Sequence, residues 1–299
     1  MNMKKTLFIA VAIALSITIN AQKVALHNSE GVQLFTGENA FINAYGASAP
    51  GDTIYLSGGS FLVPATINKK LLIFGAGHYP DSTIVTGRTV LRSTVTLDEN
   101  ADEFHLEGVE INGDLTFTKN KDINNVIIKY CKITNIIIDG TTNPSNNLSF
   151  IRNVINEFNL MNASNVEISN NIINSIRNTF GNIISNNIYL NNVYVDPWTS
   201  FLIIGNNNII LNNIFISNRA TDGSGNTFYY NLFVTSTPNY GTSPTASGNY
   251  TGILQADIFV NQSGTTFNYT HDYHLKNPET YFGTDGTQVG IYGGTYPYK

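Results

Sequence analysis

The sequence of 299 residues has very little cysteine and little charge. Its single cysteine, Cys131, excludes an intramolecular disulfide framework, so a buried core must hold a chain of this length together. Only 12% of the residues are charged, and the formal net charge is −5. Because no basic run interrupts this mildly acidic composition, we expect no nucleic-acid partner.

Two common catalytic signatures are missing as well. The stretch GAGHYP, residues 75–80, lacks the third glycine and the following helix that a phosphate-binding loop needs. Glycoside hydrolysis needs two carboxylates within several ångströms of each other. The central repeats of the chain are nearly free of acidic residues. Neither nucleotide binding nor glycoside hydrolysis is indicated.

The first 21 residues have the composition of a secretory signal peptide. Lys4 and Lys5 precede an apolar run over residues 7–19, and Ala21 is a small residue before the expected cleavage point. The apolar run is too short to favour a membrane-spanning helix. We therefore expect an exported protein, either secreted or at the cell surface, with no membrane-spanning segment in the mature chain.

One nine-residue phrase occurs twice in the middle of the chain, as NIYLNNVYV at residues 187–195 and as NIILNNIFI at residues 208–216. Weaker copies lie on both sides. When the copies are aligned, the second asparagine of each pair forms a column at intervals of 18 or 21 residues. The column contains Asn153, Asn171, Asn192, Asn213 and Asn231.

The two positions after this asparagine are apolar in every copy. The first position holds Val154, Ile172, Val193, Ile214 and Leu232, and the second holds Ile155, Ile173, Tyr194, Phe215 and Phe233. Aliphatic and aromatic runs of this kind favour parallel strands. A period of about 20 residues accommodates two or three short strands with their turns. We predict stacked coils with asparagine at a corner, where it tolerates left-handed backbone and can form a hydrogen-bonded ladder.

This pattern resembles the right-handed parallel β-helix of the pectate-lyase-like superfamily, including its asparagine ladder. The stretch at residues 49–77 is similar to the first coils of that family, and the stretch at residues 272–294 is similar to the closing segment of secreted bacterial members. The resemblance implies an all-β, single-stranded solenoid. It is not specific for activity, since the superfamily includes lyases, hydrolases, esterases, adhesins and non-catalytic proteins. The adjacent aspartates typical of its hydrolases do not occur in this sequence.

The expected organisation has four parts. Residues 1–21 are the signal peptide, residues 22–50 form an N-terminal cap, residues 51–268 form the β-helix, and residues 269–299 form a C-terminal capping segment. The phrase TGENAFINAYG within the first cap predicts a short helix that is capped by Thr36 and ended by Gly46. Such caps cover the apolar ends that a solenoid otherwise exposes.

An acidic stretch near residue 100 is a candidate calcium site. Asp98, Asp102 and Glu103 could supply carboxylate oxygens to a hard cation, although their spacing matches no defined calcium loop. The alternative is a solvated turn. Proton abstraction beside a uronate carboxylate needs a positioned base. The candidates, all in the N-terminal half, are His78, Arg88, Arg92, His105, Lys129 and Lys132, and of these we select Arg92, His105 and Lys129. We expect no cofactor, and calcium only if the protein is a lyase.

A second candidate site follows from the repeat itself. Arg177, Trp198 and Arg219 are spaced by 21 residues, in the same frame as the asparagine column, and Asp196 lies close to the tryptophan. An exposed tryptophan between two guanidinium groups could stack on a sugar ring. The alternative is that these side chains only stiffen their loops by cation–π contact.

These observations favour a secreted or surface-exposed β-helix protein that binds an extracellular polysaccharide or a cell-envelope glycan, or that serves as a structural, adhesin-like module. We expect no catalysis. The alternative is a polysaccharide lyase that acts on an acidic, uronate-containing glycan.

Overall fold

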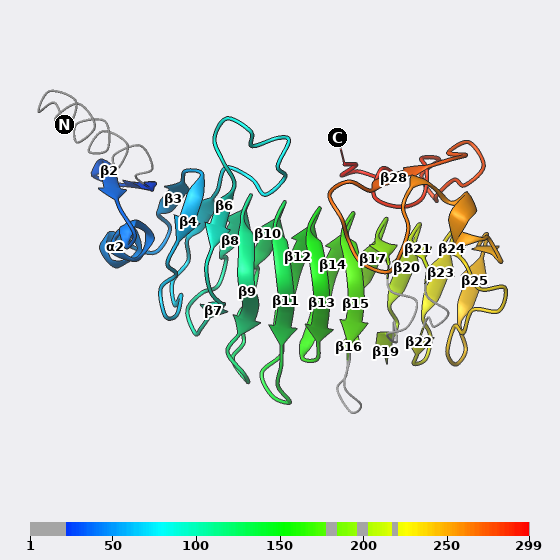
Figure 1. Ribbon diagram of the computed structural model, residues 1–299. Coiled ribbons are helices and arrows are strands. Elements are labelled where there is room, and N and C mark those ends of the chain that lie inside the picture. The colour runs from blue at the N-terminus through cyan, green and yellow to red at the C-terminus, as the bar shows by residue number, and fades with distance from the viewer. Residues whose placement is uncertain (1–21, 178–183, 196–202, 217–220, 299) are drawn as a thin grey trace, which may run out of the picture.

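A computed structural model describes residues 22–177, 184–195, 203–216 and 221–298. These residues form a parallel β-solenoid of about eight turns that is nearly all β, with one α-helix near its start (Figure 1). The predicted fold class is confirmed. Each turn contributes one strand to each of two long sheets, and short turns connect them.

The first sheet begins with an antiparallel hairpin and continues as parallel strands. Its order is β2 (Gly31–Thr36), β1 (Lys23–Asn28), β3 (Thr53–Leu56), β5 (Leu72–Phe74), β8 (His105–Glu107), β10 (Ile127–Lys129), β12 (Ser145–Ile151), β14 (Ala163–Ser169), β17 (Ile188–Leu190), β20 (Ile209–Leu211), β23 (Thr227–Tyr229) and β25 (Thr245–Ser247). The short strands β16 (Ile184–Ser185), β19 (Ile203–Asn206) and β22 (Thr221–Asp222) pair beside this row.

The second sheet is parallel throughout. Its order is β4 (Gly59–Phe61), β6 (Thr89–Leu91), β9 (Glu110–Phe117), β11 (Lys132–Ile138), β13 (Val154–Leu160), β15 (Ile172–Arg177), β18 (Val193–Tyr194), β21 (Ile214–Phe215), β24 (Leu232–Phe233) and β26 (Tyr250–Thr251), with β7 (Val95–Leu97) paired to β9. This sheet carries both apolar columns predicted from the repeat.

The register of the second sheet matches the predicted columns. Val154 pairs with Ile172, and the pairing continues coil by coil to Leu232. The neighbouring column points into the solenoid, where the rings of Tyr194 and Phe215 lie 4.8 Å apart and almost parallel. Phe233 continues this stack at the same spacing. The ring spacing equals the distance between paired strands, so the aromatic stack follows directly from the register.

The two asparagines of each pair have different roles, which corrects the prediction of a single corner residue. The first asparagine has the left-handed backbone, as at Asn170, Asn191 and Asn212. The second asparagine is buried with ordinary backbone and accepts a hydrogen bond from the preceding coil. The backbone N–H of Asn171, for example, donates to Asn192 Oδ1 at 2.9 Å. Similar bonds run from Asn153 through Asn171, Asn192, Asn213 and Asn231 to Asn249.

A second ladder lies at the start of the first-sheet strands. The backbone N–H of Asn187 donates to Asn208 Oδ1 at 3.0 Å, and that of Asn208 donates to Asn226 Oδ1 at 2.9 Å. Asn186 and Asn207, which precede the first two members, again have left-handed backbone. Paired asparagines therefore mark two corners of the coil.

The N-terminal helix begins later than the sequence predicts. Helix α2 (Ala40–Ala47) packs Phe41 and Ala44 into the core at the end of the solenoid. Thr36 belongs to β2 instead of capping the helix, and Asn39 occupies the N-cap position without a side-chain cap. The helix also runs through Gly46. Burial of Phe41, and not an N-terminal side-chain cap, therefore stabilises the start of this helix.

Residues 253–298, here called the strap, return along the side of the solenoid (Figure 1, orange to red). The strap contains a 3-10 turn (Gln255–Asp257) and the antiparallel pair β27 (Phe259–Asn261) and β28 (Asp272–Leu275). Its apolar side chains cover the outward column of the second sheet, and the two form one buried cluster. The strap members are Ile258, Phe259, Tyr273, Leu275, Val289 and Ile291. Most of the segment expected as a C-terminal cap, residues 269–298, thus lies against the side of the coils.

The left-handed asparagines hold the strap in place. Asn170 Nδ2 donates to the carbonyls of Ile291 and Gly293 at 3.0 and 2.8 Å. Asn212 Oδ1 accepts from the backbone N–H of Thr284 at 2.9 Å. Farther along the same corner, Arg152 Nε donates to the carbonyl of Tyr296 at 2.8 Å. One column of corner residues therefore positions the last 15 or so residues of the strap.

Candidate functional site

The outward column of the second sheet changes character at its N-terminal end. Register places Lys132 beside Val154 and Glu110 beside Lys132. The column is thus aliphatic under the strap and charged in the two coils that precede Val154. A charged pair at an otherwise apolar position makes this boundary the first candidate for chemistry on the described surface.

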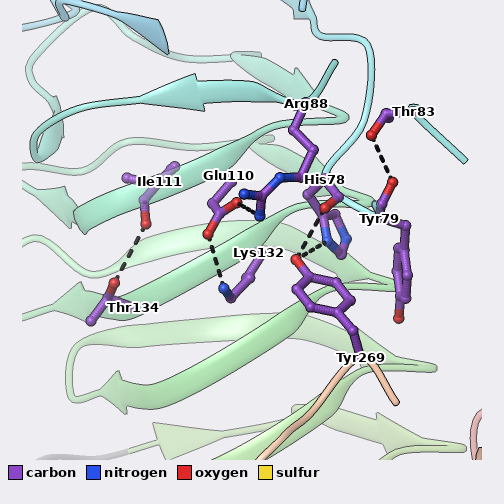
Figure 2. Close-up of polar contacts among 9 residues, drawn as sticks. All are labelled: His78, Tyr79, Thr83, Arg88, Glu110, Ile111, Lys132, Thr134 and Tyr269. Carbon is purple, nitrogen blue, oxygen red and sulfur yellow. Dashed lines mark hydrogen bonds and ion pairs between the residues drawn. The ribbon is translucent and has the colours of Figure 1, made fainter. Parts of the chain in front are cut away.

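Glu110 lies between two cations (Figure 2). Its Oε2 is 2.6 Å from Arg88 Nη1, and its Oε1 is 2.9 Å from Lys132 Nζ. The side chain of Glu110 is only 10% exposed, whereas Arg88 and Lys132 are 40% and 35% exposed. The carboxylate is therefore fixed from both sides, and its partners remain accessible to solvent or to a ligand.

His78 and Tyr269 border this network. His78 Nδ1 and the hydroxyl of Tyr269 are 3.1 Å apart, and the same hydroxyl lies 3.1 Å from the His78 carbonyl. A carbonyl only accepts, so the Tyr269 hydroxyl donates to it and Nδ1–H donates to the hydroxyl. Burial, followed by the charges of Lys132 and Arg88, lowers the pKa of His78 to about 3. His78 is thus neutral at physiological pH.

Tyr269 also retains its proton. Burial and then the negative charge of Glu110 raise the pKa of Tyr269 to about 12. The ammonium group of Lys132 lies 5.2 Å from the centre of the Tyr269 ring. Tyr269 belongs to the strap, so this contact and the bond to His78 join the strap to the early coils.

A cavity of about 220 Å³ opens beside Lys132, and we call it the lysine cavity. Its floor consists of two neighbouring outward columns, and Thr266 and Phe267 of the strap form its wall. The floor residues include Glu110, Asn112, Lys132, Thr134, Val154, Asn156 and Asn174. The polar members offer both donors and acceptors.

A larger cavity of about 390 Å³, here called the tyrosine cavity, lies at the corner of the coils. Six tyrosines line it, together with Arg152 and Phe267. The tyrosines are Tyr79, Tyr130, Tyr269, Tyr273, Tyr292 and Tyr298. Burial raises the pKa of Tyr79, Tyr269, Tyr273, Tyr292 and Tyr298, so these hydroxyls are protonated at neutral pH.

Arg152 forms part of the wall of the tyrosine cavity. Its guanidinium carbon lies 5.0 Å from the centre of the Tyr130 ring, and Nη1 also donates to the Tyr130 hydroxyl. Both residues have left-handed backbone and occupy the corner position of successive coils. The cavity therefore combines broad aromatic faces with one fixed cation.

The acidic candidates near residue 100 belong to turns. Asp102 Oδ1 accepts the backbone N–H of Asn124 at 2.7 Å, Glu103 pairs with Lys70, and the carbonyl of Asp98 accepts from Ala101. Within the described ranges, no three His, Cys, Asp or Glu side chains gather closely enough to hold a metal ion. Asp98, Asp102 and Glu103 therefore make separate contacts, and calcium binding by these residues stays a prediction.

Of the candidate bases, Lys132 lines the lysine cavity, whereas Arg92, His105 and Lys129 lie outside both cavities. Arg92 pairs with Glu38 at 2.9 Å and thereby connects the second sheet to the start of the helix. His105 Nε2 lies 3.0 Å from Glu107 Oε2 on the first sheet. Lys129 lies on the next coil, where it is in register with Glu107. His105 and Lys129 are therefore neighbours, and Arg92 is separate from them.

The sugar-stacking site predicted from the repeat lies mostly outside the described residues. Asp196, Trp198 and Arg219 are not among them, and Arg177 is described only as the last residue of β15. Register places Arg177 beside Asn159 of the preceding coil. Sugar binding by these four residues stays a prediction.

Neither cavity is predicted by the sequence. Counting back by 22 residues from Val154 reaches Lys132 and then Glu110, so the repeat contained a signal for the charged column. The repeat gives no such signal for Phe267 or Tyr269, because the strap to which they belong does not follow the repeat. Their positions beside Lys132 and Glu110 could not be predicted.

Comparison of the chain with protein-family models, with curated proteins and with solved structures finds no match. The solenoid geometry supports the fold class on its own. Among the described residues, no helix is long and apolar enough to cross a membrane.

Proposed function

We propose that this chain is an exported β-solenoid protein that binds an extracellular or cell-envelope glycan in the tyrosine cavity, without catalysis of its own. The single observation that carries this proposal is the cavity of about 390 Å³ with six tyrosines and Arg152 in its lining. Ligand pockets typically have volumes of ~300–1,000 Å³ and combine apolar walls with a few fixed polar groups.

The chemistry of the lining suits a sugar. Aromatic faces pack against the apolar C–H faces of a pyranose ring, and protonated hydroxyls donate to its oxygens. Burial raises the pKa of Tyr273 and Tyr292, so both are such donors. Arg152 is held by the strap carbonyl of Tyr296 and adds a cation that can bind a hydroxyl or a carboxylate.

A glycan array followed by titration calorimetry tests this proposal. Tyr130 and Tyr230 form a matched pair, since both have left-handed backbone and are 39% and 38% exposed. Only Tyr130 lines the cavity. We expect Tyr130→Asn to weaken binding by about five-fold or more, as loss of one stacking contact does, and Tyr230→Asn to leave binding unchanged. Equal effects of the two variants, or no bound glycan, would contradict the proposal. The latter result would favour a purely structural envelope protein.

The second candidate function is a polysaccharide lyase that acts on a uronate glycan, and one observation favours it. Arg88, Lys132, Tyr269 and neutral His78 gather around Glu110 beside the lysine cavity. Cations can offset the charge of a substrate carboxylate. Uronate polymers incubated with the protein, with and without calcium, would give ultraviolet absorbance from unsaturated products. Loss of that absorbance in Lys132→Ala and not in Lys129→Ala would support this candidate.

Export and membership of the pectate-lyase-like superfamily belong to the same proposal. The basic start and apolar run of residues 1–21 support export, and the stacked parallel coils with buried asparagines support the superfamily. Cell fractionation with N-terminal sequencing tests export. We expect the mature protein to begin at Gln22 in the envelope or the medium, whereas an intact Met1 terminus in the cytoplasm would contradict export.

A further inference from the structure

The lysine cavity and the tyrosine cavity share one wall residue, Phe267 of the strap. The Phe267 ring is fixed by its neighbours, because its centre lies 5.0 Å from that of Tyr269 and 6.2 Å from that of Tyr273. The two cavities are therefore neighbours, and one held aromatic ring lines both.

Each cavity is small for a ligand site when taken alone. The lysine cavity of about 220 Å³ lies below the usual lower limit of ~300 Å³, and the tyrosine cavity of about 390 Å³ lies just above it. Together they fall well within the usual range. The volumes of the two cavities therefore fit one ligand that occupies both better than two independent ligands.

One residue of the lysine cavity lining, Asn174, has an unused hydrogen-bond acceptor. Asn174 Nδ2 donates to Asn156 Oδ1 at 3.2 Å, whereas the buried Asn174 Oδ1 accepts no hydrogen bond from any described residue. A buried polar atom without a partner costs free energy, and a ligand hydroxyl could supply the missing donor. Lys132 Nζ has three N–H donors, and Glu110 accepts from it at 2.9 Å. The cavity thus offers both an acceptor and a cationic donor to a polar ring.

We propose that the lysine cavity is a second sugar subsite, so that the ligand is an oligosaccharide of at least two residues. One sugar ring stacks in the tyrosine cavity. The next sugar ring lies beyond Phe267 in the lysine cavity, where one of its hydroxyls donates to Asn174 Oδ1 and Lys132 is within reach. This inference rests on the proposed glycan binding in the tyrosine cavity. The two floor columns continue from coil to coil, so they can accept a ring on either side of Lys132.

The test compares chain lengths. Glucose, cellobiose and cellotetraose, and galacturonic acid with its dimer and tetramer, are titrated into the full chain by calorimetry. We expect affinity to rise by about ten-fold or more from monosaccharide to disaccharide in the series that binds, because the second ring adds its own hydrogen bonds and contacts.

Asn174→Ala then isolates the subsite, with Asn159→Ala as its matched control. Asn159 is an outward-facing residue of the neighbouring strand β13, is bonded to Glu157, and does not line either cavity. We expect Asn174→Ala to weaken disaccharide binding by about five-fold while monosaccharide binding stays within two-fold. The thermal unfolding midpoint and circular dichroism verify that both variants fold.

The outcomes separate the subsite from the glycan site. Affinity that does not change with chain length overturns the second subsite, and so does an equal loss of monosaccharide and disaccharide binding in Asn174→Ala. Failure of every sugar to bind the unaltered protein overturns glycan binding itself. If affinity rises with chain length but Asn159→Ala reduces it as much as Asn174→Ala does, the second sugar ring does not lie in the lysine cavity.

Discussion

Glu110 holds two cations at the point where the outward column changes from charged to aliphatic. The carboxylate is largely buried, and its two oxygens contact Arg88 and Lys132 separately. Neutralising this carboxylate leaves both cations without their charged partner. The loss is smaller than for a fully buried pair, because Arg88 and Lys132 retain contact with water.

We therefore predict that Glu110→Gln lowers the free energy of unfolding by about 1–3 kcal/mol. Urea denaturation at neutral pH measures this change. Glu103→Gln is the matched control, since Glu103 pairs with Lys70 and both side chains are exposed. An exposed pair contributes about 0–1 kcal/mol. Equal effects of the two substitutions would contradict the role given to Glu110.

His78 predicts a dependence of stability on pH. Burial first, then the charges of Lys132 and Arg88, lower the pKa of His78 to about 3 in the folded protein, against an ordinary value of 6.5. Between these values the unfolded chain binds a proton that the folded chain does not. Stability contributed by neutral His78 is therefore complete above pH 6.5 and is lost as the pH falls towards 3.

The expected loss between pH 7.5 and pH 5 is about 2 kcal/mol. Urea denaturation across this range should show a clear decline for the unaltered protein and a flatter profile for His78→Gln. His27→Gln serves as the control, because His27 is exposed on the first strand. A decline of the same size in His78→Gln would contradict burial of a neutral imidazole.

At the scale of elements, the asparagine pairs divide two tasks between adjacent positions. The second residue joins coil to coil inside the solenoid, and the first turns the chain and presents its side chain to the strap. Asparagine suits both positions, because it tolerates left-handed backbone and carries both a donor and an acceptor.

Asn170→Gly tests how the strap is held. Glycine keeps the left-handed backbone without strain and removes only the two bonds to Ile291 and Gly293. We expect amides of residues 283–298 to exchange hydrogen about ten-fold faster, which corresponds to the loss of roughly 1.4 kcal/mol of local stability. Asn207→Gly, at a left-handed position on the other corner, should leave this exchange unchanged. Unchanged exchange in Asn170→Gly would show that these bonds do not hold the strap.

The ladder makes a separate prediction. Asn192 Nδ2 donates to the Ile168 carbonyl at 2.7 Å and to Asn213 Oδ1 at 3.0 Å, in full burial. Asn192→Ala removes these donors and leaves buried partners unsatisfied, so we expect a loss of about 3 kcal/mol. Asn249→Ala, at the partly buried end of the ladder, should cost about half as much or less because water replaces its bonds. Thermal unfolding of both variants measures the difference, and a larger cost at Asn249 would contradict the ladder's contribution.

At the scale of the whole molecule, the sequence predicts the solenoid and not the site. The copies around Asn171, Asn192 and Asn213 repeat one local pattern, and stacking of identical coils converts that pattern directly into register. The spacing therefore defined which residues pair. The predicted left-handed position was the second asparagine of each pair, whereas the structure has it at the first. A column of aligned asparagines does not show which of two adjacent residues forms the turn and which points into the interior.

The site depends on contacts that no period encodes. Tyr269 meets His78 across 191 residues of sequence, and Arg152 meets Tyr296 across 144. The strap is unique in sequence, so its route over the corner residues follows from packing of the outward aliphatic column. Function in this molecule is proposed to reside where the regular coils and the irregular strap meet.

The most direct test of that proposal is a crystal structure of the protein with the oligosaccharide that binds it most tightly on the array. We expect density for one sugar ring against Tyr130 and Tyr292, and for the next ring beyond Phe267 near Asn174. Density on the outer face of the first sheet, near Lys70 and His105, would contradict the central claim that the strap and the second sheet together form the glycan site.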